Sequence, residues 1–349
     1  MDLDILRKKI ADIDKEIVEL MIRRNDTAGE IGNIKKMLGM PLTDRSVENA
    51  VVERYRAAAE NTSLPADTAE SICRILIKSS VELQSPIVRK GCDKSITIVG
   101  GNGKMGKWMQ RYFESMGAKV NVIDVSAGVP EDMRDSDVVV ISVPISSVGS
   151  VLEEADRLCR KDALIFDVSS VKTPFTMKLK DMAERRKVCS VHPMFGPSAA
   201  SMNGRNVIVC DCGCKAAVSE ASELFDNDGS NIIVTDIGRH DELIAYVLGF
   251  AHASNITFFT ALSDSGIPFR QLKETSSTTF ERCLAACLPV SEENASLYHS
   301  IQRMNARSEE MWDVYENALK KVRDASLTDD DDMFAELMDS GKRYLNDHR

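Results

Sequence analysis

A single apolar row spans the first 38 residues and constrains the fold of this chain more than any other feature. Leucines and isoleucines recur there at alternating spacings of three and four residues, the period of one face of an α-helix: Leu3, Leu6, Ile10, Ile13, Ile17, Leu20, Ile31, Ile34 and Leu38. No proline interrupts the row before Pro41, and Gly39 is a typical helix end. The row predicts one helix over residues 3–38, about 54 Å long at 1.5 Å per residue.

Such a helix is too long to be covered by a small domain of its own chain. Two shorter helices are predicted near residues 45–61 and 66–84, separated by NTSLP, and a linker follows at SPIVRKGCDKS. Because these helices cannot cover the whole row, we expect a second copy of the chain to do so in an intertwined homodimer.

From residue 95 the pattern changes to short β-branched segments that alternate with helices. These segments are nearly continuous apolar runs, as expected of parallel strands buried on both faces: ITIVG, KVNVID, DVVVISV, ALIFDVS and VCSVH. After about residue 240 the composition predicts helices, with breaks at SGIP, LPVSEEN and SLTDDDD. We therefore predict a multi-domain chain: an all-α domain over 1–90, an α/β Rossmann-type domain over 91–240 and an all-α domain over 241–349.

Composition restricts the class of protein. A net charge of -10 argues against a general nucleic-acid binder, which needs a cationic surface for phosphates. The N-terminal segment MDLDILRKKI has no apolar signal-peptide core, and no stretch of eighteen or more residues is continuously apolar, so we expect neither secretion nor a membrane span. The nine cysteines, without a secretory signal, favour a reducing cytoplasm.

Two segments contain residue types that bind metals. VCDCGC brings Cys210, Cys212 and Cys214 together, but this spacing is not the usual C-x-x-C and no histidine is near. A strand that ends in a turn at Gly213 is the better interpretation. Four consecutive aspartates at 329–332 fit a helix N-terminus, where negative charge is favourable, better than a metal site. We therefore predict no metal.

A glycine-rich segment follows the first predicted strand. In ITIVGGNGKMG, Gly101, Gly103 and Gly106 have the spacing G-x-G-x-x-G and open a helix. We expect the first glycine to permit a tight turn, the second to let a pyrophosphate approach the backbone, and the third to pack helix against strand. The pyrophosphate would lie at the helix N-terminus, beside Lys104 and Met105, where backbone N–H groups point at it.

The second predicted strand ends in Asp124, at the usual place of an acidic residue that accepts hydrogen bonds from the 2′-hydroxyl of the adenosine ribose. No arginine follows in residues 125–127 to bind a 2′-phosphate, so the segment favours NAD over NADP. Val143 and Pro144, where the third predicted strand ends, complete the predicted cofactor site.

His192 is the candidate for the proton transfer that accompanies hydride removal. It follows the predicted strand VCSV and enters the loop HPMFGP, in which Pro193 and Pro197 restrict the backbone. The C-terminal end of a parallel strand is where open α/β sheets bind ligands. A histidine there can accept a hydroxyl proton as a general base, and a structural loop histidine is the other interpretation that position alone allows.

Several of these segments together resemble the prephenate dehydrogenase family. The resemblance covers nearly all of residues 95–349 and rests on DVSSVK, HPMFGP, GRHDELIAYVLGFAH, ETSS and SLYHSI. Members of that family oxidise prephenate with NAD, and loss of carbon dioxide gives 4-hydroxyphenylpyruvate, on the way to tyrosine. The resemblance implies that His192 is the catalytic base at the ring hydroxyl and that Ser170 assists there. It also implies that His240 and His252 line the substrate pocket.

One departure from that family concerns the substrate carboxylate. The family commonly carries two arginines after the double serine, and an ungapped comparison puts Glu281 and Pro289 at those positions. The dianionic substrate still needs a cation, because an unpaired buried carboxylate is costly. Arg282, which is adjacent, and Arg270, which lies upstream, are the candidates to supply it.

In the predicted N-terminal helix, two cations stand near the apolar row. The row would continue through Arg24 and Thr27, and Lys35 follows Arg24 by about three turns, so both cations project from nearly the same face. A cation in an apolar row is costly unless an anion meets it. An anionic ligand is one interpretation, and a solvated helix end or a salt bridge between subunits is the other.

The whole N-terminal pattern resembles the all-helical chorismate mutase family, whose members form intertwined dimers of one long and two shorter helices. The matching segments are LRKKI, IRRNDTAGEIGNIKK, a P-x-x-D segment and S-x-x-x-Q. The resemblance implies that Arg24 and the partner subunit's Arg7 bind the two carboxylates of chorismate, and that Lys35 and Gln84 hydrogen-bond the ether oxygen whose bond breaks. The residues implied to frame the ring are Asp44, Glu48 and Ser80.

The implied mutase reaction is a pericyclic rearrangement without proton transfer or covalent intermediate. The protein need only hold a compact substrate conformer and stabilise charge on the ether oxygen. Here too the chain departs from the family, which usually has an arginine immediately before the glutamate. This chain has Val47 there, and Arg45 is the candidate substitute.

The two resemblances support each other, because chorismate mutase makes the molecule that prephenate dehydrogenase consumes. Together they imply a bifunctional enzyme with chorismate and prephenate as substrates. The alternative is an arogenate or other hydroxy-acid dehydrogenase whose helical domain only dimerises or senses an effector.

Overall fold

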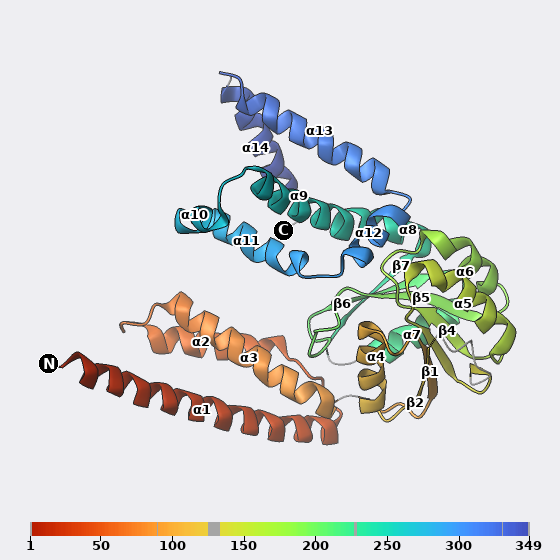
Figure 1. Cartoon of the computed structure of the whole chain (residues 1–349). Helices are drawn as coiled ribbons and strands as arrows, with labels where there is room; N and C mark the ends of the chain where they lie inside the picture. The colour runs from red at the N-terminus through yellow and green to blue at the C-terminus, as the bar shows by residue number, and fades with distance from the viewer. Residues whose placement is uncertain (1, 89, 125–132, 227–228, 330, 348–349) are drawn as a thin grey trace. The chain divides into compact units, whose positions relative to one another are not determined.

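The computed structural model describes residues 2–88, 90–124, 133–226, 229–329 and 331–347 (Figure 1). Within it the chain divides into two compact units. The first comprises Met1–Ser169 and Met177–Asp236, and the second comprises Ser170–Thr176 and Ile237–Arg349. The short segment 170–176 thus leaves the α/β part of the chain and belongs to the C-terminal helices.

The N-terminal part consists of three helices, α1 (Leu3–Leu38), α2 (Arg45–Ala59) and α3 (Ala66–Val88). The predicted long helix is confirmed, and it ends where Gly39 adopts a left-handed φ of 62°. α3 packs against both α1 and α2. It runs four residues beyond its predicted end, into the segment expected to be a linker.

The apolar row of α1 remains largely exposed in the single chain. All of α1 is described, and its buried residues are Ala28 and Gly32. Three members of the row, Ile10, Ile13 and Ile17, are 60%, 45% and 43% exposed. Exposed apolar area of this extent along one helix indicates a face that a partner covers.

The described strands form one sheet in the order β2-β1-β3-β4-β5-β6-β7. Neighbours are parallel except β5 and β6, which are antiparallel. The strands are β1 (Ser95–Val99), β2 (Lys119–Ile123), β3 (Val138–Ile141), β4 (Leu164–Asp167), β5 (Lys187–Pro193), β6 (Asn206–Asp211) and β7 (Asn231–Asp236). The predicted fold class is confirmed. β7 was not expected from the sequence, because an edge strand with mostly exposed side chains lacks the buried pattern of the others.

Helices cover both faces of this sheet: α4 (Lys104–Ser115), α5 (Ile145–Leu158), α6 (Thr176–Ala183) and α7 (Lys215–Phe225). α4 and α7 share one core with the strands, and α5 and α6 lie to the other side of the sheet (Figure 1). Aromatic side chains fill the shared core. Tyr112 stacks on Trp108 at 5.4 Å and on Phe225 at 5.9 Å, and its hydroxyl donates to Leu224 O at 2.8 Å.

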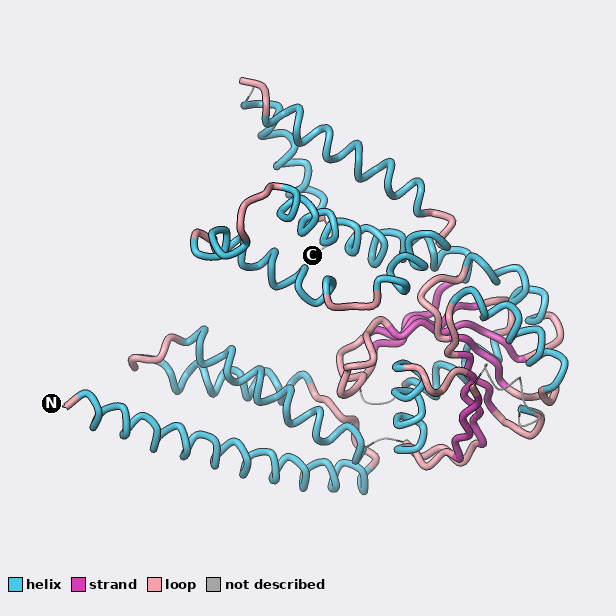
Figure 2. The backbone as a smooth tube through the Cα atoms, in the orientation of Figure 1, coloured by secondary structure: helices cyan, strands magenta, loops and turns pink. Residues whose placement is uncertain are grey.

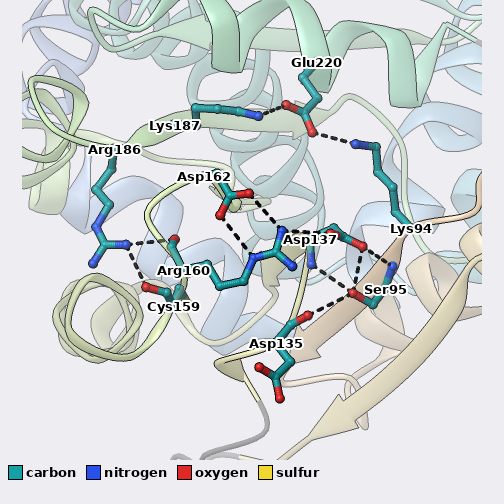
Figure 3. A network of polar contacts seen from close by, with 10 residues as sticks. All are labelled: Lys94, Ser95, Asp135, Asp137, Cys159, Arg160, Asp162, Arg186, Lys187 and Glu220. Atoms are coloured by element: carbon teal, nitrogen blue, oxygen red, sulfur yellow. Dashed lines mark hydrogen bonds and ion pairs between the residues drawn. The ribbon is translucent and has the colours of Figure 1, made fainter.

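Ion pairs fill the amino edge of the sheet (Figure 3). Glu220 of α7 pairs with Lys94 at 2.9 Å and with Lys187 at 2.5 Å, and Arg160 pairs with Asp137 at 3.0 Å. Burial raises the pKa of the Glu220 carboxyl, but the hydrogen bonds from the two lysines outweigh burial and hold the pKa below its usual value. These charged groups have structural partners, so the sites considered below lie elsewhere.

The C-terminal part is helical: α8 (Ile237–Ile244), the π-helical segment η4 (Ala245–Phe250), α9 (Ala251–Asp264), α10 (Phe269–Glu274), α11 (Thr278–Ser291), α12 (Ala295–Met304), α13 (Ser308–Ser326) and α14 (Asp331–Asn346). Figure 2 shows the contrast with the strand-containing middle of the chain. The predicted breaks at SGIP and SLTDDDD are confirmed, and Asp331 and Asp332 occupy the first turn of α14. Asp330 lies outside the described residues. At LPVSEEN the helix continues through Pro289 to Ser291 before it ends.

The run from Ile237 to Asp264 is long and apolar enough to cross a membrane, judged by length and composition alone. It was not expected from the sequence, which has no uninterrupted apolar stretch of that length. The run contains buried His240 and Asp241, and ionisable groups are rare in membrane-spanning helices. Length and composition are therefore weak evidence for a span here.

Candidate active sites

A cavity with a volume of about 760 Å³ lies between α1, α2, α3 and the loop before α2. Arg7 is exposed on α1, where it pairs with Asp4 at 3.2 Å, and it is not among the described residues that line the cavity. The family resemblance implies that Arg7 acts in the cavity of a partner subunit. This role stays a prediction, because the structure contains one chain. Most residues with an implied role toward chorismate do line the cavity: Arg24, Lys35, Asp44, Glu48, Ser80 and Gln84.

Neutral acceptors hold two cations of α1 at this cavity. Arg24 donates to Ser80 Oγ and, at 2.7 Å, to a backbone carbonyl of α3. Lys35 donates to Gln84 Oε1 at 3.2 Å and, at 2.5 Å, to a backbone carbonyl of the loop before α2. Both side chains belong to half-buried residues, and neither forms an ion pair with a described residue. Fixed cations with neutral partners stabilise an anion that enters the cavity.

Gly32 brings α1 and α3 close together next to Lys35. A Cβ atom at this position would lie 3.1 Å from Cγ of Gln84, so a larger residue would displace that side chain. Gln84 is 6% exposed. The close approach therefore fixes the amide of Gln84 beside the ammonium group of Lys35.

Asp44 has a structural task in addition to its place in the cavity. It is the N-cap of α2, and its Oδ1 accepts hydrogen bonds from Ser46 Oγ at 2.6 Å and from Ser46 N at 2.9 Å. The Ser46 side chain, followed by the backbone N–H groups, lowers the pKa of the Asp44 carboxyl. The carboxylate implied to lie beside the substrate ring is thus also the N-cap of α2.

The cavity contains one further cation, Arg54, which was not expected from the sequence. Arg45, the candidate substitute for the missing arginine, is exposed at the start of α2 and is not among the described residues that line the cavity. Arg54 does line it, seven residues after Val47. Seven residues are about two helical turns, so Arg54 lies on the same face of α2 as Val47, and this spacing was the sequence signal for its place in the cavity.

The glycine-rich turn joins β1 to α4. The left-handed φ, 82°, belongs to Gly100, one residue before the glycine expected to permit the tight turn. A Cβ at Gly101 would lie 2.5 Å from Val122 Cγ1, and a Cβ at Gly106 would lie 2.5 Å from Gly100 O. Both glycines therefore allow close packing of strand and helix. Gly103 is the N-cap of α4 and makes no side-chain cap, which leaves that helix N-terminus open to an anion.

The other predicted cofactor residues surround this turn. Asp124 is half-buried after β2, and its Oδ2 accepts from Asn102 Nδ2 at 2.9 Å. Val143 is buried after β3, Pro144 caps α5, and β1 and β3 are neighbours where the strand order reverses. A reversal of strand order is the usual ligand position in such sheets. Lys104 is exposed and Met105 half-buried in the first turn of α4, and residues 125–127 lie outside the described residues.

His192 lies near the carboxyl end of β5, as predicted, and is 3% exposed. At the same edge, β4 ends in the fully buried Asp167, whose carboxylate accepts hydrogen bonds from Ser190 Oγ, Ser169 Oγ and, at 3.0 Å, Ser169 N. Asp167 was not expected from the sequence as a site residue. It fixes the ends of two adjacent strands, β4 and the β5 strand that carries His192.

Within the second unit, Asp241 ties the segment that carries Ser170 to α8. Its carboxylate accepts the backbone N–H of Lys172 at 3.0 Å, the N–H and hydroxyl of Thr173 at 2.6 Å each, and Nδ1 of His240 at 2.7 Å. Burial raises the pKa of Asp241, but these hydrogen bonds, that of His240 first, outweigh burial and lower it. The carboxylate therefore stays ionised, and Nδ1 of His240 carries a proton.

His252 belongs to α9, beyond the π-helical segment that separates it from His240. A π-helix bonds i to i+5, so it changes the face on which the following residues lie. The ring of His252 stacks on Tyr298 at 4.1 Å, and its Nδ1 is buried without a hydrogen-bond partner among the described residues. Burial lowers the pKa of His252, which favours the neutral ring.

Glu281, which stands where the family commonly has an arginine, has partners of its own. That side chain accepts from Lys273 at 2.8 Å and from Ser276, and the Lys273 contact contributes most to lowering its pKa. It fixes the loop between α10 and α11. Arg270 pairs with Glu274 at 2.7 Å, whereas Arg282 is exposed and forms no ion pair or hydrogen bond with a described residue.

Among the described residues, no group of three or more histidine, cysteine, aspartate or glutamate side chains is arranged to hold a metal ion. Cys210 and Cys212 are buried and Cys214 is half-buried. The Cys212 thiol donates to Cys210 O at 3.6 Å, in the turn expected at Gly213. The VCDCGC segment is thus a strand end followed by the N-cap of α7.

Comparison with known families gives three matches along the chain. A chorismate mutase type II model matches residues 6–85. The nucleotide-binding domain of prephenate dehydrogenase matches residues 107–234, and the dimerization domain of prephenate dehydrogenase matches residues 236–340.

Individual proteins also match the chain, one over nearly its whole length and one over its N-terminal part alone. The T-protein of Haemophilus influenzae is 27% identical over 328 residues, which are 93% of this chain and 86% of that protein. A chorismate mutase of Methanocaldococcus jannaschii is 30% identical over 90 residues, 26% of this chain and 91% of that protein. Among solved structures, a prephenate dehydrogenase from A. aeolicus in complex with hydroxyphenyl propionate and NAD+ has a TM-score of 0.59 and 16% identity, and the match covers 73% of this chain and 98% of that one. This last likeness concerns the fold alone.

Proposed function

Because the chain belongs to the chorismate mutase type II and prephenate dehydrogenase families, we propose that it is a bifunctional enzyme of tyrosine biosynthesis. It rearranges chorismate to prephenate and then oxidises prephenate, with loss of carbon dioxide, to 4-hydroxyphenylpyruvate. The observation that carries this proposal is the cavity in which Arg24, Lys35, Ser80 and Gln84 come together. It occurs in a chain that also matches the dehydrogenase over residues 107–340.

The mutase half works by positioning and electrostatics. Arg24, fixed by Ser80, binds a substrate carboxylate, and the partner subunit's Arg7 binds the other. Gln84 Oε1 accepts from Lys35, so the Nε2 group of Gln84 is left to donate. The Lys35 ammonium and the Gln84 amide stabilise the negative charge that grows on the ether oxygen as its bond to carbon breaks. No proton has to move.

In the dehydrogenase half, His192 accepts the proton of the ring hydroxyl as a general base. The carbon that bears this hydroxyl loses a hydride, for which NAD would be the acceptor when bound. The bond to the leaving carboxylate then supplies the electrons that complete the aromatic ring, and carbon dioxide departs. The roles of Ser170, His240 and His252 toward the substrate are those that the resemblance to the prephenate dehydrogenase family implies.

We assign the cofactor to the β1–α4 turn. Gly101 and Gly106 have no room for a Cβ, and the N-terminus of α4 has no side-chain cap, so the pyrophosphate fits there. Asp124 would hold the adenosine ribose through its hydroxyls, and Val143 and Pro144 would complete the binding site for the dinucleotide. The cation for the prephenate carboxylate is Arg282, whose guanidinium has no ion pair among the described residues.

One coupled assay tests the whole proposal. Purified protein given chorismate and NAD is expected to form NADH without any added mutase, because both steps reside in one chain. The increase in absorbance at the NADH band measures this, with NADP in place of NAD as the comparison for cofactor choice. NADH from prephenate but not from chorismate would contradict a catalytic N-terminal domain. NADH from arogenate alone would contradict prephenate as the substrate.

We also propose that the protein is a homodimer and resides in the cytoplasm. The exposed apolar row of α1 needs a partner, and a second copy supplies an identical row. Residues 236–340 match a domain described as a dimerization domain. All nine cysteines lie in described residues and none forms a disulfide, as expected in a reducing compartment.

Replacing Ile17 with glutamate is expected to lower the rate of chorismate rearrangement by at least about tenfold. The charge lies within the row that a second copy covers, and separating the two α1 helices withdraws the partner subunit's Arg7 from the site. Chorismate consumption measures the effect, and Asn33→Glu places the same charge on α1 outside the row as a control. A wild-type mass of 38.6 kDa in light scattering, or an unchanged rate in Ile17→Glu, would contradict the dimer.

A further inference from the structure

The face of α2 that lines the cavity contains three aliphatic residues and three residues with a polar or charged group. Val47, Val51 and Ala58 belong to this face, and Arg54 is its only cation among the described residues. Arg54 itself is exposed, and the other polar side chains of this face are Glu48 and Tyr55.

The hydrogen bonds of α2 set Arg54 apart from its neighbour Arg56. Arg56 pairs with Asp67 at 3.2 Å and with Glu70 at 2.5 Å, and so connects α2 to α3. Arg54 has no hydrogen bond or ion pair with any described residue. Its five N–H donors are therefore free of partners in the part of the chain that the structure describes.

The direction of the helix places the side chain of Arg54 over the preceding turn of α2, which also lines the cavity. Side chains of a helix lean toward its N-terminus, so the guanidinium of Arg54 extends over the turn that contains Val51. Arg45 cannot take the same place. It precedes Val47 by two residues, which rotates it about 200° around the helix axis.

Charge in the cavity also depends on Arg54. The charged residues that line it, among those described, are Arg24, Lys35, Asp44, Glu48 and Arg54. Without Arg54, two cations face two carboxylates and the lining is neutral. Arg54 gives the lining that this chain supplies a net positive charge, which favours a substrate with two carboxylates and to which the partner subunit's Arg7 adds.

We propose that Arg54 binds a carboxylate of chorismate through its two-pronged guanidinium. This inference rests on the proposed mutase function and names a substrate-binding residue for it. The contact is with a carboxylate that is ionised before, during and after the rearrangement. It therefore strengthens binding of substrate and transition state alike, and its loss acts on KM more than on kcat.

The test compares three variants of the full-length protein with the wild type in chorismate consumption. Arg54→Ala is expected to raise KM about 10- to 100-fold with kcat within about threefold, as for loss of a charge-assisted hydrogen bond. Arg54→Lys keeps the charge but loses the two parallel N–H donors of the guanidinium, so its KM should lie between those of the wild type and Arg54→Ala. Arg45→Ala removes the same charge from the same helix outside the cavity, and its KM should stay within about twofold of the wild type.

The outcomes separate the inference from the proposed function. NADH formation from prephenate in each variant reports that the chain is folded. If the wild type does not consume chorismate, the mutase function is wrong and the inference falls with it. If the wild type is active and Arg54→Ala equals Arg45→Ala, Arg54 is a solvated residue at the rim and the inference alone is wrong. A fall in kcat without a rise in KM would also overturn it.

Discussion

Replacing Lys35 with alanine is expected to lower kcat for the rearrangement of chorismate by about 10²- to 10³-fold. The ammonium group is held beside Gln84 by two neutral acceptors and is fixed before substrate arrives. Charge grows on the ether oxygen only as its bond breaks, so a fixed donor at that oxygen stabilises the transition state more than the substrate. Removal of one such donor typically costs this much in rate. The effect therefore differs in kind from that of Arg54→Ala, which acts on KM.

The control for Lys35→Ala is Lys36→Ala. Lys36 is the next residue of α1, is exposed, and is not among the described residues that line the cavity, so its loss changes the net charge equally. Its kcat for chorismate should stay within about twofold of the wild type. Both variants should form NADH from prephenate at the wild-type rate, because the second reaction uses other residues. A Lys35→Ala protein that retains this second activity and still rearranges chorismate normally would refute the assignment of Lys35.

In the N-terminal domain, the sequence pattern predicted the helices, and the resemblance to the chorismate mutase family implied six of the residues that line the cavity. A row with a helical period predicts a helix of definite length, and Arg24 and Lys35 on nearly the same face of it are compatible with an anionic ligand, a solvated helix end or a salt bridge between subunits. Two things could not be predicted from single positions. Asp44 caps α2, which depends on its hydrogen bonds to Ser46. Arg54 lies at the cavity because of the way in which α2 packs on α3, and its spacing of seven residues from Val47 indicates this place only once Val47 is known to line the cavity.

In the dehydrogenase part, the sequence predicted the parallel strands, the glycine-rich turn and His192, because each depends on local pattern. It did not predict the contacts that join distant segments. Asp241 connects the segment after β4 to α8 across 69 positions of sequence, and neither end of that contact carries a period or a motif that points to the other. The π-helical segment before His252 is hidden for a related reason, since its residues resemble those of any apolar helix.

Replacing His192 with asparagine is expected to lower NADH formation from prephenate by about 10²- to 10⁴-fold, the usual contribution of a general base. Asparagine has a similar size and hydrogen-bonds its surroundings but cannot accept the hydroxyl proton. His192 is buried near the end of β5, and the hydrogen bond from Ser190 of the same strand to Asp167 fixes this part of the strand. The imidazole ring is therefore held in one position. Binding of NAD should not change, because the β1–α4 turn is untouched.

The matched control for His192→Asn is His299→Asn, at an exposed histidine of α12. It should form NADH from prephenate within about twofold of the wild type. The His192→Asn protein should still consume chorismate at the wild-type rate, which reports that the chain is folded and dimeric. Lys35→Ala and His192→Asn would then each remove one reaction and leave the other, as two separate sites require. Loss of both reactions in either variant would instead point to a shared site, and full NADH formation in His192→Asn would move the proton transfer to another residue.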